Sequence, residues 1–200
     1  MGLNMRITKD LKFVSKIDTV SRGTVFFYSA QISRDVFEQF FAELGDVVSY
    51  VTNLQNPADL VRVAPQLAYP ALKRAAIKRG TWDTPPGGPT GVEQGLIAEF
   101  ERLTTVAFAS PEGQKQVPLA MATSNGILDD DDRIEILSEI AFFTAVSRAA
   151  ASGLRDSLLE SAGKFRGWVY TSESFTAALA SLKTSSEPVN TTKKASSVIA

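Results

Sequence analysis

The sequence predicts a mainly α protein with a short N-terminal β-hairpin, an α+β fold whose helices form a bundle-like domain. The first reason is a change of hydrophobic period within residues 24–51, where a β-branched and aromatic run gives way to helical spacing. The second is that apolar residues keep recurring at helical spacing as far as Leu182. The third is the loss of apolar residues from Lys183 onward.

These observations also predict the domain organisation. A chain of 200 residues is long enough for one domain with a real core but short for two. We expect a single globular domain over residues 1–182, with a β-hairpin at 12–29 and helices over 33–182. Residues 183–200 are expected to form a disordered, flexible C-terminal tail, because they contain almost nothing that can pack.

The hairpin is predicted from two short runs. Residues 12–18 carry Phe13, Val14 and Ile17, and residues 24–29 are β-branched and aromatic. Arg22 and Gly23 are typical of a turn between them, but the connection is longer than two residues and the register is not predictable.

An aromatic helix is expected to follow. Ser33 is a good N-cap, and Asp35 falls in the first turn, where the helix dipole favours negative charge. Its apolar stripe fits the protein's own core, which is the simpler interpretation, or a face offered to a partner helix. The stripe consists of Val36, Phe37, Phe40, Phe41, Leu44, Val47, Val48 and Val51.

The next segment contains several prolines. Asn56 and Pro57 are typical of a helix start, and Pro65 and Pro70 are expected to break or kink the helix. Its last part, residues 71–79, should end before Gly80. Residues 80–91 hold so many glycines and prolines that they predict a surface loop or hinge, with Trp82 either folded back or left as a contact point.

The second half is predicted to be helical. Helical spacing favours a helix over 92–107, a short helical turn over 118–123 and the longest helix over 129–152, with a bent continuation beyond Gly153. A loop is expected at 110–116 and a last short helix at 172–182.

Composition limits the possible functions. The chain has 21 basic and 22 acidic residues. This nearly balanced charge does not indicate binding to nucleic acid or to an anionic membrane. It lacks cysteine and histidine, so serine–histidine triads, cysteine nucleophiles and zinc sites of those ligands are excluded. No apolar run reaches the roughly 20 residues that a membrane span needs. We expect no enzyme, cofactor or metal, although a carboxylate or lysine site would revive an enzymatic function.

Four charged or glycine-rich groups are candidate sites. Asp129–Asp132 do not match an EF-hand and are better explained as helix N-terminal caps. Gly87 and Gly88 lack the lysine of a phosphate-binding loop. The third group is best explained as cations favoured near a helix C-terminus, and it consists of Lys73, Arg74, Lys78 and Arg79. The fourth is best explained as carboxylates on a solvated helix face, and it consists of Glu93, Glu99 and Glu101.

Three sequence blocks carry a resemblance to a known family, and the resemblance extends over most of residues 12–183. The first, S-x-x-I-S-R-x-V-F-E-x-x-F, is matched by Ser29, Ile32, Ser33, Arg34, Val36, Phe37, Glu38 and Phe41. The second, G-V-E-x-G-L-x-A-E-x-x-R-L-T, is matched by Gly91, Val92, Glu93, Gly95, Leu96, Ala98, Glu99, Arg102, Leu103 and Thr104. The third, a G-x-I-D-x-x-D element followed by E-x-x-x-F-F-T, is matched by Gly126, Leu128, Asp129, Asp132, Glu139, Phe142, Phe143 and Thr144, with leucine in place of isoleucine.

These blocks resemble the tail assembly chaperones of long-tailed, siphovirus-type bacteriophages. The resemblance implies a non-enzymatic chaperone in the host cell cytoplasm. Such proteins are expected to cover the apolar helices of the tape measure protein until tail tube protein polymerises around it. Association with copies of itself is left open, and no nucleic acid or membrane partner is expected. A frameshifted longer form is also implied, with Lys193 and Lys194 at a candidate slippery site. The alternative is a virion structural protein, such as a tail-completion, neck or minor capsid component.

The predicted partner-binding residues are the aromatic and apolar side chains of the two most apolar helices, with the loop tryptophan. They are Phe37, Phe40, Phe41, Leu44, Trp82, Phe142 and Phe143. We expect an apolar edge beside the helix at 129–152 if the aromatic helix is not completely buried.

Overall fold

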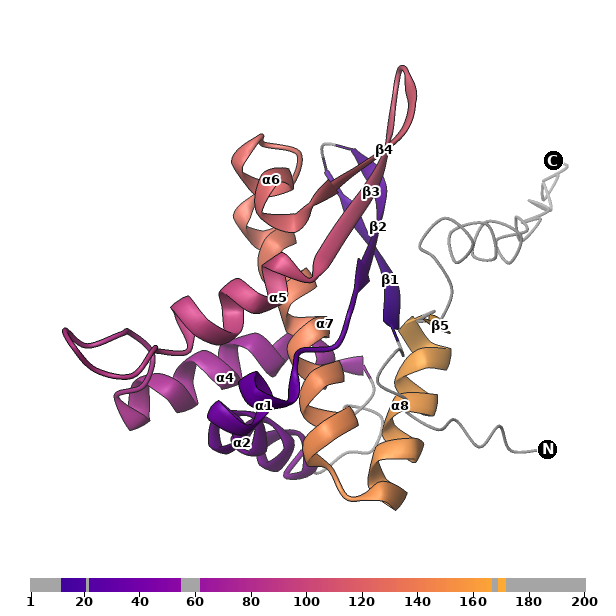
Figure 1. Cartoon of the computed structure of the whole chain (residues 1–200). Helices are drawn as coiled ribbons and strands as arrows, with labels where there is room; N and C mark the ends of the chain where they lie inside the picture. The colour runs from indigo at the N-terminus through magenta and orange to yellow at the C-terminus, as the bar shows by residue number, and fades with distance from the viewer. Residues whose placement is uncertain (1–11, 21, 55–61, 167–168, 172–200) are drawn as a thin grey trace, which may run out of the picture.

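A computed structural model describes residues 12–20, 22–54, 62–166 and 169–171. It contains a layer of helices packed beside one antiparallel sheet (Figure 1). The strands are β1 (Lys12–Thr19), β2 (Gly23–Ser29), β3 (Thr104–Ser110), β4 (Gly113–Pro118) and β5 (Val169–Thr171). The helices are α1 (Arg34–Gln39), α2 (Phe41–Thr52), α4 (Ala64–Arg79), the π-helix η1 (Glu93–Ile97), α5 (Ala98–Arg102), α6 (Leu119–Ser124), α7 (Asp130–Ala149) and α8 (Ser152–Arg166).

The predicted hairpin is present, but it is only part of the sheet. β1 and β2 pair antiparallel, from Phe13 opposite Ser29 to Thr19 opposite Gly23. The sheet has five strands in the order β4-β3-β2-β1-β5, so the hairpin is its centre. The α+β class is therefore confirmed, whereas the prediction of helices alone over 33–182 is wrong.

The predicted helix over 92–107 is wrong in its second half. It ends at Arg102, and Thr104–Ser110 form β3, which pairs with β2. The apolar spacing of Leu103 and Ala107 suits either structure, and the β-branched residues 104–106 favour a strand once β2 offers an edge to pair with. The predicted loop at 110–116 is also wrong, because Gly113–Pro118 form the edge strand β4.

The aromatic segment begins as predicted and then divides. The backbone N–H of Val36 donates to the Ser33 side chain, so Ser33 is the N-cap, and Asp35 lies in the first turn. A break at Phe40 separates α1 from α2. One straight helix is thus replaced by two, which turn different apolar residues toward the core.

The next helix also differs from prediction at its prolines. Pro65 lies at the start of α4, but the helix continues through Pro70 instead of ending there. Gly80, at φ 70°, ends α4 in the left-handed conformation that glycine adopts without strain. The predicted start at Asn56 and Pro57 lies outside the described residues, as do the predicted helix at 172–182 and the tail.

The core is built around α7. From Ile136 to Ser147 this helix is buried on all sides, because it packs against α2, α4 and α8 as well as β1. Phe143 stacks on Phe13 with ring centroids 5.0 Å apart, which joins the helical layer to the sheet. α8 follows as a separate helix after Ala150 and Ala151, so the predicted bend near Gly153 is a full break. The short helical turn predicted at 118–123 is α6, which lies beside β3 and β4.

Candidate partner-binding surface

Most of the predicted partner-binding residues lie in the core. Five of the seven side chains are buried, so the fold does not bring the seven together on one surface. Phe143 stacks on Phe13 of β1, and α7 also packs against α2 and α4. The five are Phe40, Leu44, Trp82, Phe142 and Phe143.

Two of the predicted residues reach the surface as an aromatic edge. The rings of Phe37 and Phe41 meet edge-to-face with centroids 5.7 Å apart, and Phe41 is 55% exposed. The guanidinium of Arg148, on α7, lies 5.6 Å from the Phe37 ring centroid and donates to the Ile32 carbonyl at 2.7 Å. Burial lowers the pKa of Arg148. The expected apolar edge beside α7 therefore exists, but only Phe41 is prominently exposed in it.

A concave surface lies between α2 and α4. This α2–α4 groove has a volume of about 330 Å³. Its apolar residues include Tyr50, which is 40% exposed, and small residues of α4 that leave the space open. The groove is lined by Asp46, Tyr50, Leu67, Pro70, Ala71, Arg74, Ala75 and Lys78.

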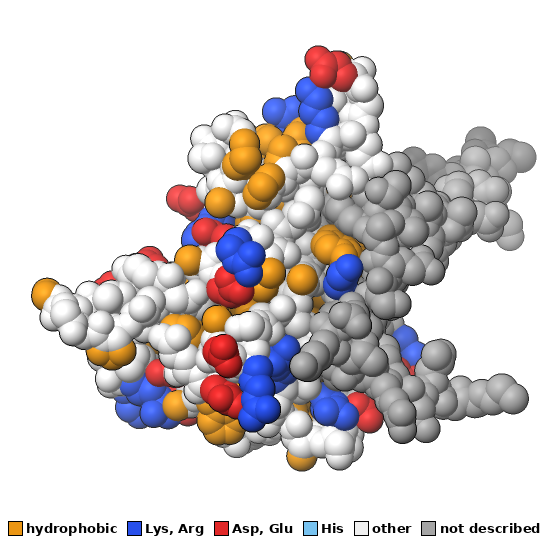
Figure 2. Space-filling model, viewed as in Figure 1, with side chains coloured by type: hydrophobic (Ala, Val, Ile, Leu, Met, Phe, Trp, Pro, Cys, Tyr) orange, Lys and Arg blue, Asp and Glu red, His pale blue; other side chains and the backbone are white. Residues whose placement is uncertain are grey.

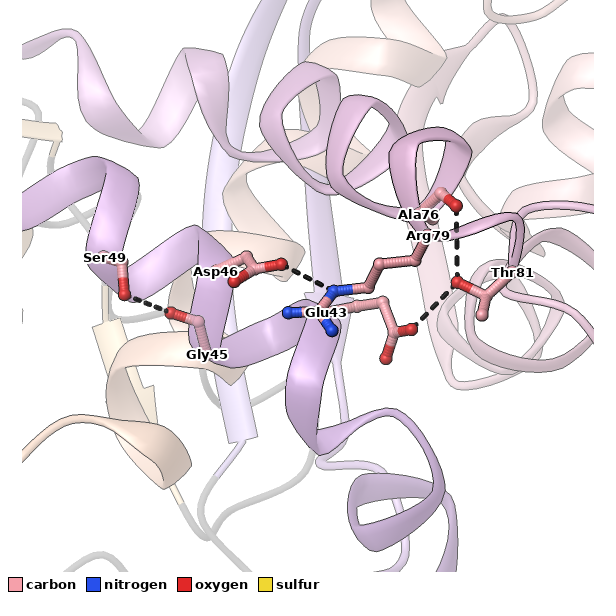
Figure 3. A network of polar contacts seen from close by, with 7 residues as sticks. All are labelled: Glu43, Gly45, Asp46, Ser49, Ala76, Arg79 and Thr81. Carbon is pink, nitrogen blue, oxygen red and sulfur yellow. Dashed lines mark hydrogen bonds and ion pairs between the residues drawn. The ribbon is translucent and has the colours of Figure 1, made fainter.

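A polar network holds the two helices at one end of the groove (Figure 3). Arg79 donates from Nε to Asp46 at 2.8 Å, and the Asp46 carboxylate raises the pKa of Arg79. Just beyond α4, the Thr81 hydroxyl donates to Glu43 at 2.9 Å. These contacts join the C-terminal end of α4 to α2. The groove therefore lies between two helices that are held together by side-chain contacts.

The loop after α4 is folded back onto the helix. Trp82 is buried, its ring meets Tyr69 edge-to-face at 6.2 Å, and the Lys73 ammonium lies 5.0 Å from its ring centroid. The loop's end is joined to its start, since the backbone N–H of Val92 donates to the Thr81 carbonyl at 2.8 Å. The predicted loop at 80–91 is confirmed, and Trp82 is a structural anchor.

A smaller hollow lies beside this loop. Its volume is about 160 Å³, and Glu43, Phe40 and Thr81 line it together with loop residues that include Asp83 and Pro85. Because Glu43 already accepts the Thr81 hydroxyl and lies in the first turn of α2, the fold accounts for this carboxylate.

The acidic cluster caps α7 as predicted. The Asp129 carboxylate accepts the backbone N–H of Asp132 at 2.8 Å, and the Asp132 carboxylate accepts the backbone N–H of Asp129 at 3.2 Å. Partial burial raises the pKa of Asp132. Among the described residues, no group of three or more acidic side chains could hold a metal ion.

The other sequence candidates have ordinary structural roles or lie on the surface. Gly87 and Gly88 form a turn in which the Gly88 N–H donates to the Pro85 carbonyl at 2.9 Å. Glu99 and Glu101 pair with Arg102 and Arg133, and Glu93 is exposed in η1. Within the part of the chain that the structure describes, no helix is both long and apolar enough to cross a membrane.

The basic cluster on α4 is divided between two roles. Lys73 lies over Trp82 and Arg79 pairs with Asp46, whereas Arg74 and Lys78 line the α2–α4 groove. Among the described residues, neither Arg74 nor Lys78 has an ion-pair partner within 4.0 Å.

Sequence reasoning missed the groove itself. Tyr50, Leu67 and Ala71 carry no motif, and their proximity depends on how α2 packs against α4. The available signal was the run of alanines and Pro70 on α4, next to Arg74 and Lys78. On the face seen in Figure 2, apolar side chains of the described residues emerge as separate patches among charged ones.

Comparison with protein-family models, curated proteins and solved structures found no match to this chain.

Proposed function

We propose that this protein is a non-enzymatic tail assembly chaperone of a long-tailed bacteriophage. It binds an apolar helical segment of the tape measure protein in the host cytoplasm and leaves that segment when tail tube protein assembles around it. The proposal combines the three sequence blocks with one structural observation. That observation is the α2–α4 groove, whose apolar floor remains open although α2 and α4 are tied together at one end.

The groove suits a helix better than an extended chain. Most backbone N–H and C=O groups of α2 and α4 are paired within each helix, so the groove walls offer no ladder for a strand. A docking segment must satisfy its own backbone hydrogen bonds, as a helix does. Tyr50 and Leu67 supply the apolar contact that one or two anchor side chains of such a helix need.

Filling the groove tests the proposal. In cells that make this chain with the tape measure protein of the same phage, the two are expected to copurify. Ala71→Trp places a large side chain in the groove and should reduce the copurified tape measure protein about tenfold or more, which is the scale of losing one interface anchor. Ala120→Trp, on the exposed surface of α6, is the matched control and should leave the yield unchanged.

Two outcomes would contradict the proposal. The first is a soluble tape measure protein that never copurifies with this chain. The second is the presence of this chain in purified virions at a fixed copy number, measured by mass spectrometry, because an assembly chaperone leaves before the particle is complete. That second result would support the virion structural protein instead.

A further inference from the structure

Two cations that line the α2–α4 groove have no ion-pair partner among the residues that the structure describes. The carboxylate of the groove, Asp46, is already paired with Arg79. Arg74 and Lys78 both line the groove and are exposed. They lie four residues apart on one face of α4, where like charges repel each other and destabilise a helix.

The helix dipole explains the position of only one of these two cations. Lys78 lies in the last turn of α4, where positive charge is favoured. Arg74 lies before that turn, where the dipole effect has faded. Lys73, its neighbour, is held over Trp82, but within the described part of the chain no comparable contact holds Arg74.

We infer that the segment docking in the α2–α4 groove is a helix whose apolar anchor residues are flanked by carboxylates that pair with Arg74 and Lys78. Tyr50, Leu67, Pro70 and Ala71 receive the anchor, and the two cations on the α4 side receive the acidic flank. Carboxylates there would relieve the repulsion between Arg74 and Lys78. The inference rests on the proposed function for the identity of the partner, but not for the chemistry of the segment.

Charge complementarity also selects among other occupants. A nucleic acid needs a broader basic surface than two cations beside the Asp46–Arg79 pair, in a chain of net charge −1. A basic or uncharged helix would leave Arg74 and Lys78 unpaired at the rim of an apolar contact.

A photo-cross-link identifies the amino-acid sequence of the docking segment directly. The full-length chain with Tyr50→p-benzoylphenylalanine is produced in phage-infected cells, and the cross-linked peptide is sequenced by mass spectrometry. The expected peptide is a helix-forming segment with at least two Asp or Glu residues within about one turn of its apolar attachment point.

Charge variants supply the second measurement. Arg74→Glu with Lys78→Glu should weaken the cross-link about tenfold or more, because two attractive pairs become repulsive, and Arg74→Gln with Lys78→Gln should have an intermediate effect. Lys16→Glu with Lys115→Glu changes the net charge equally, on β1 and β4, and should leave the cross-link within about twofold. Unfolding midpoints equal to that of the parent chain would show that all of these variants fold.

The outcomes separate the two proposals. An acid-flanked tape measure segment whose cross-link depends on Arg74 and Lys78 supports both. The same chemistry and dependence in a different protein supports this inference and contradicts the proposed function. A neutral or basic tape measure segment overturns the inference and leaves the function standing. A cross-link to a second copy of this chain, or none at all, overturns the inference.

Discussion

At the scale of single residues, Phe40 shows how one side chain joins two parts of the chain. It ends α1 and caps α2, and its ring reaches the π-helix η1. A Cβ on Gly95 would lie 2.4 Å from the end of that ring, so only glycine permits this approach. Phe40 was predicted as a contact for a partner and is instead a contact between α1–α2 and η1.

Replacing this glycine should therefore be costly. Gly95→Ala forces the Phe40 ring to move, and overpacking of this kind costs about 1–3 kcal/mol of unfolding free energy. Chemical denaturation monitored by circular dichroism measures the loss. Gly45→Ala in α2 is the matched control, because its added Cβ would meet no atom within 4 Å beyond its chain neighbours and the nearby backbone of its own helix. It should stabilise the protein by about 0.5–1 kcal/mol through helix propensity, and equal effects at both positions would contradict the Phe40 contact.

Residues whose roles are local were the easiest to predict. Ser33, Asp129 and Gly80 act on backbone groups within a few positions of themselves, so their types and neighbours were enough. Trp82 was not predictable in this way. Its two partners, Tyr69 and Lys73, belong to α4, and nothing within the loop's own sequence selects between burial and exposure.

At the scale of elements, the N-terminus of α7 gives the clearest prediction. Asp129→Ala removes the capping box and should cost about 0.5–2 kcal/mol, because backbone N–H groups at the start of the helix lose their acceptor. Asp129→Asn keeps an acceptor oxygen and should differ from the parent by only a few tenths of a kcal/mol. Thermal unfolding of the two variants checks this, and an equal loss in both would point to charge as the cause instead of capping.

The elements that were mispredicted share one cause. Residues 104–110 have apolar positions that suit either period, and residues 113–118 are mostly polar. A strand of this kind is stabilised by its neighbour, since β3 needs the edge of β2 and β4 needs the edge of β3. The helices α6 and α7 had strong internal signals and were placed within a few residues.

At the scale of the whole molecule, the position of α7 predicts how stability is distributed. Its residues 140–146 are buried among the other helices and the sheet, so their amides should exchange with solvent only when the whole domain unfolds. β4, an exposed edge strand, and the loop residues 83–90 should exchange through local opening. Hydrogen exchange followed by mass spectrometry at increasing denaturant measures this order, and protection in β4 equal to that in α7 would contradict it.

The sequence by itself determined the α+β class, the pairing of two N-terminal strands, the capped starts of α1 and α7 and the loop after α4. Each of these depends on the periodicity or the capping chemistry of a short stretch of chain. Only the tertiary structure decided that five of the seven aromatic and apolar candidates are core, that β3 and β4 complete the sheet, and that Arg74 and Lys78 border an open groove. The physical reason is that burial and concavity depend on which elements pack together. The α2–α4 groove exists because small residues on one helix meet Tyr50 on another, and no local pattern encodes that meeting.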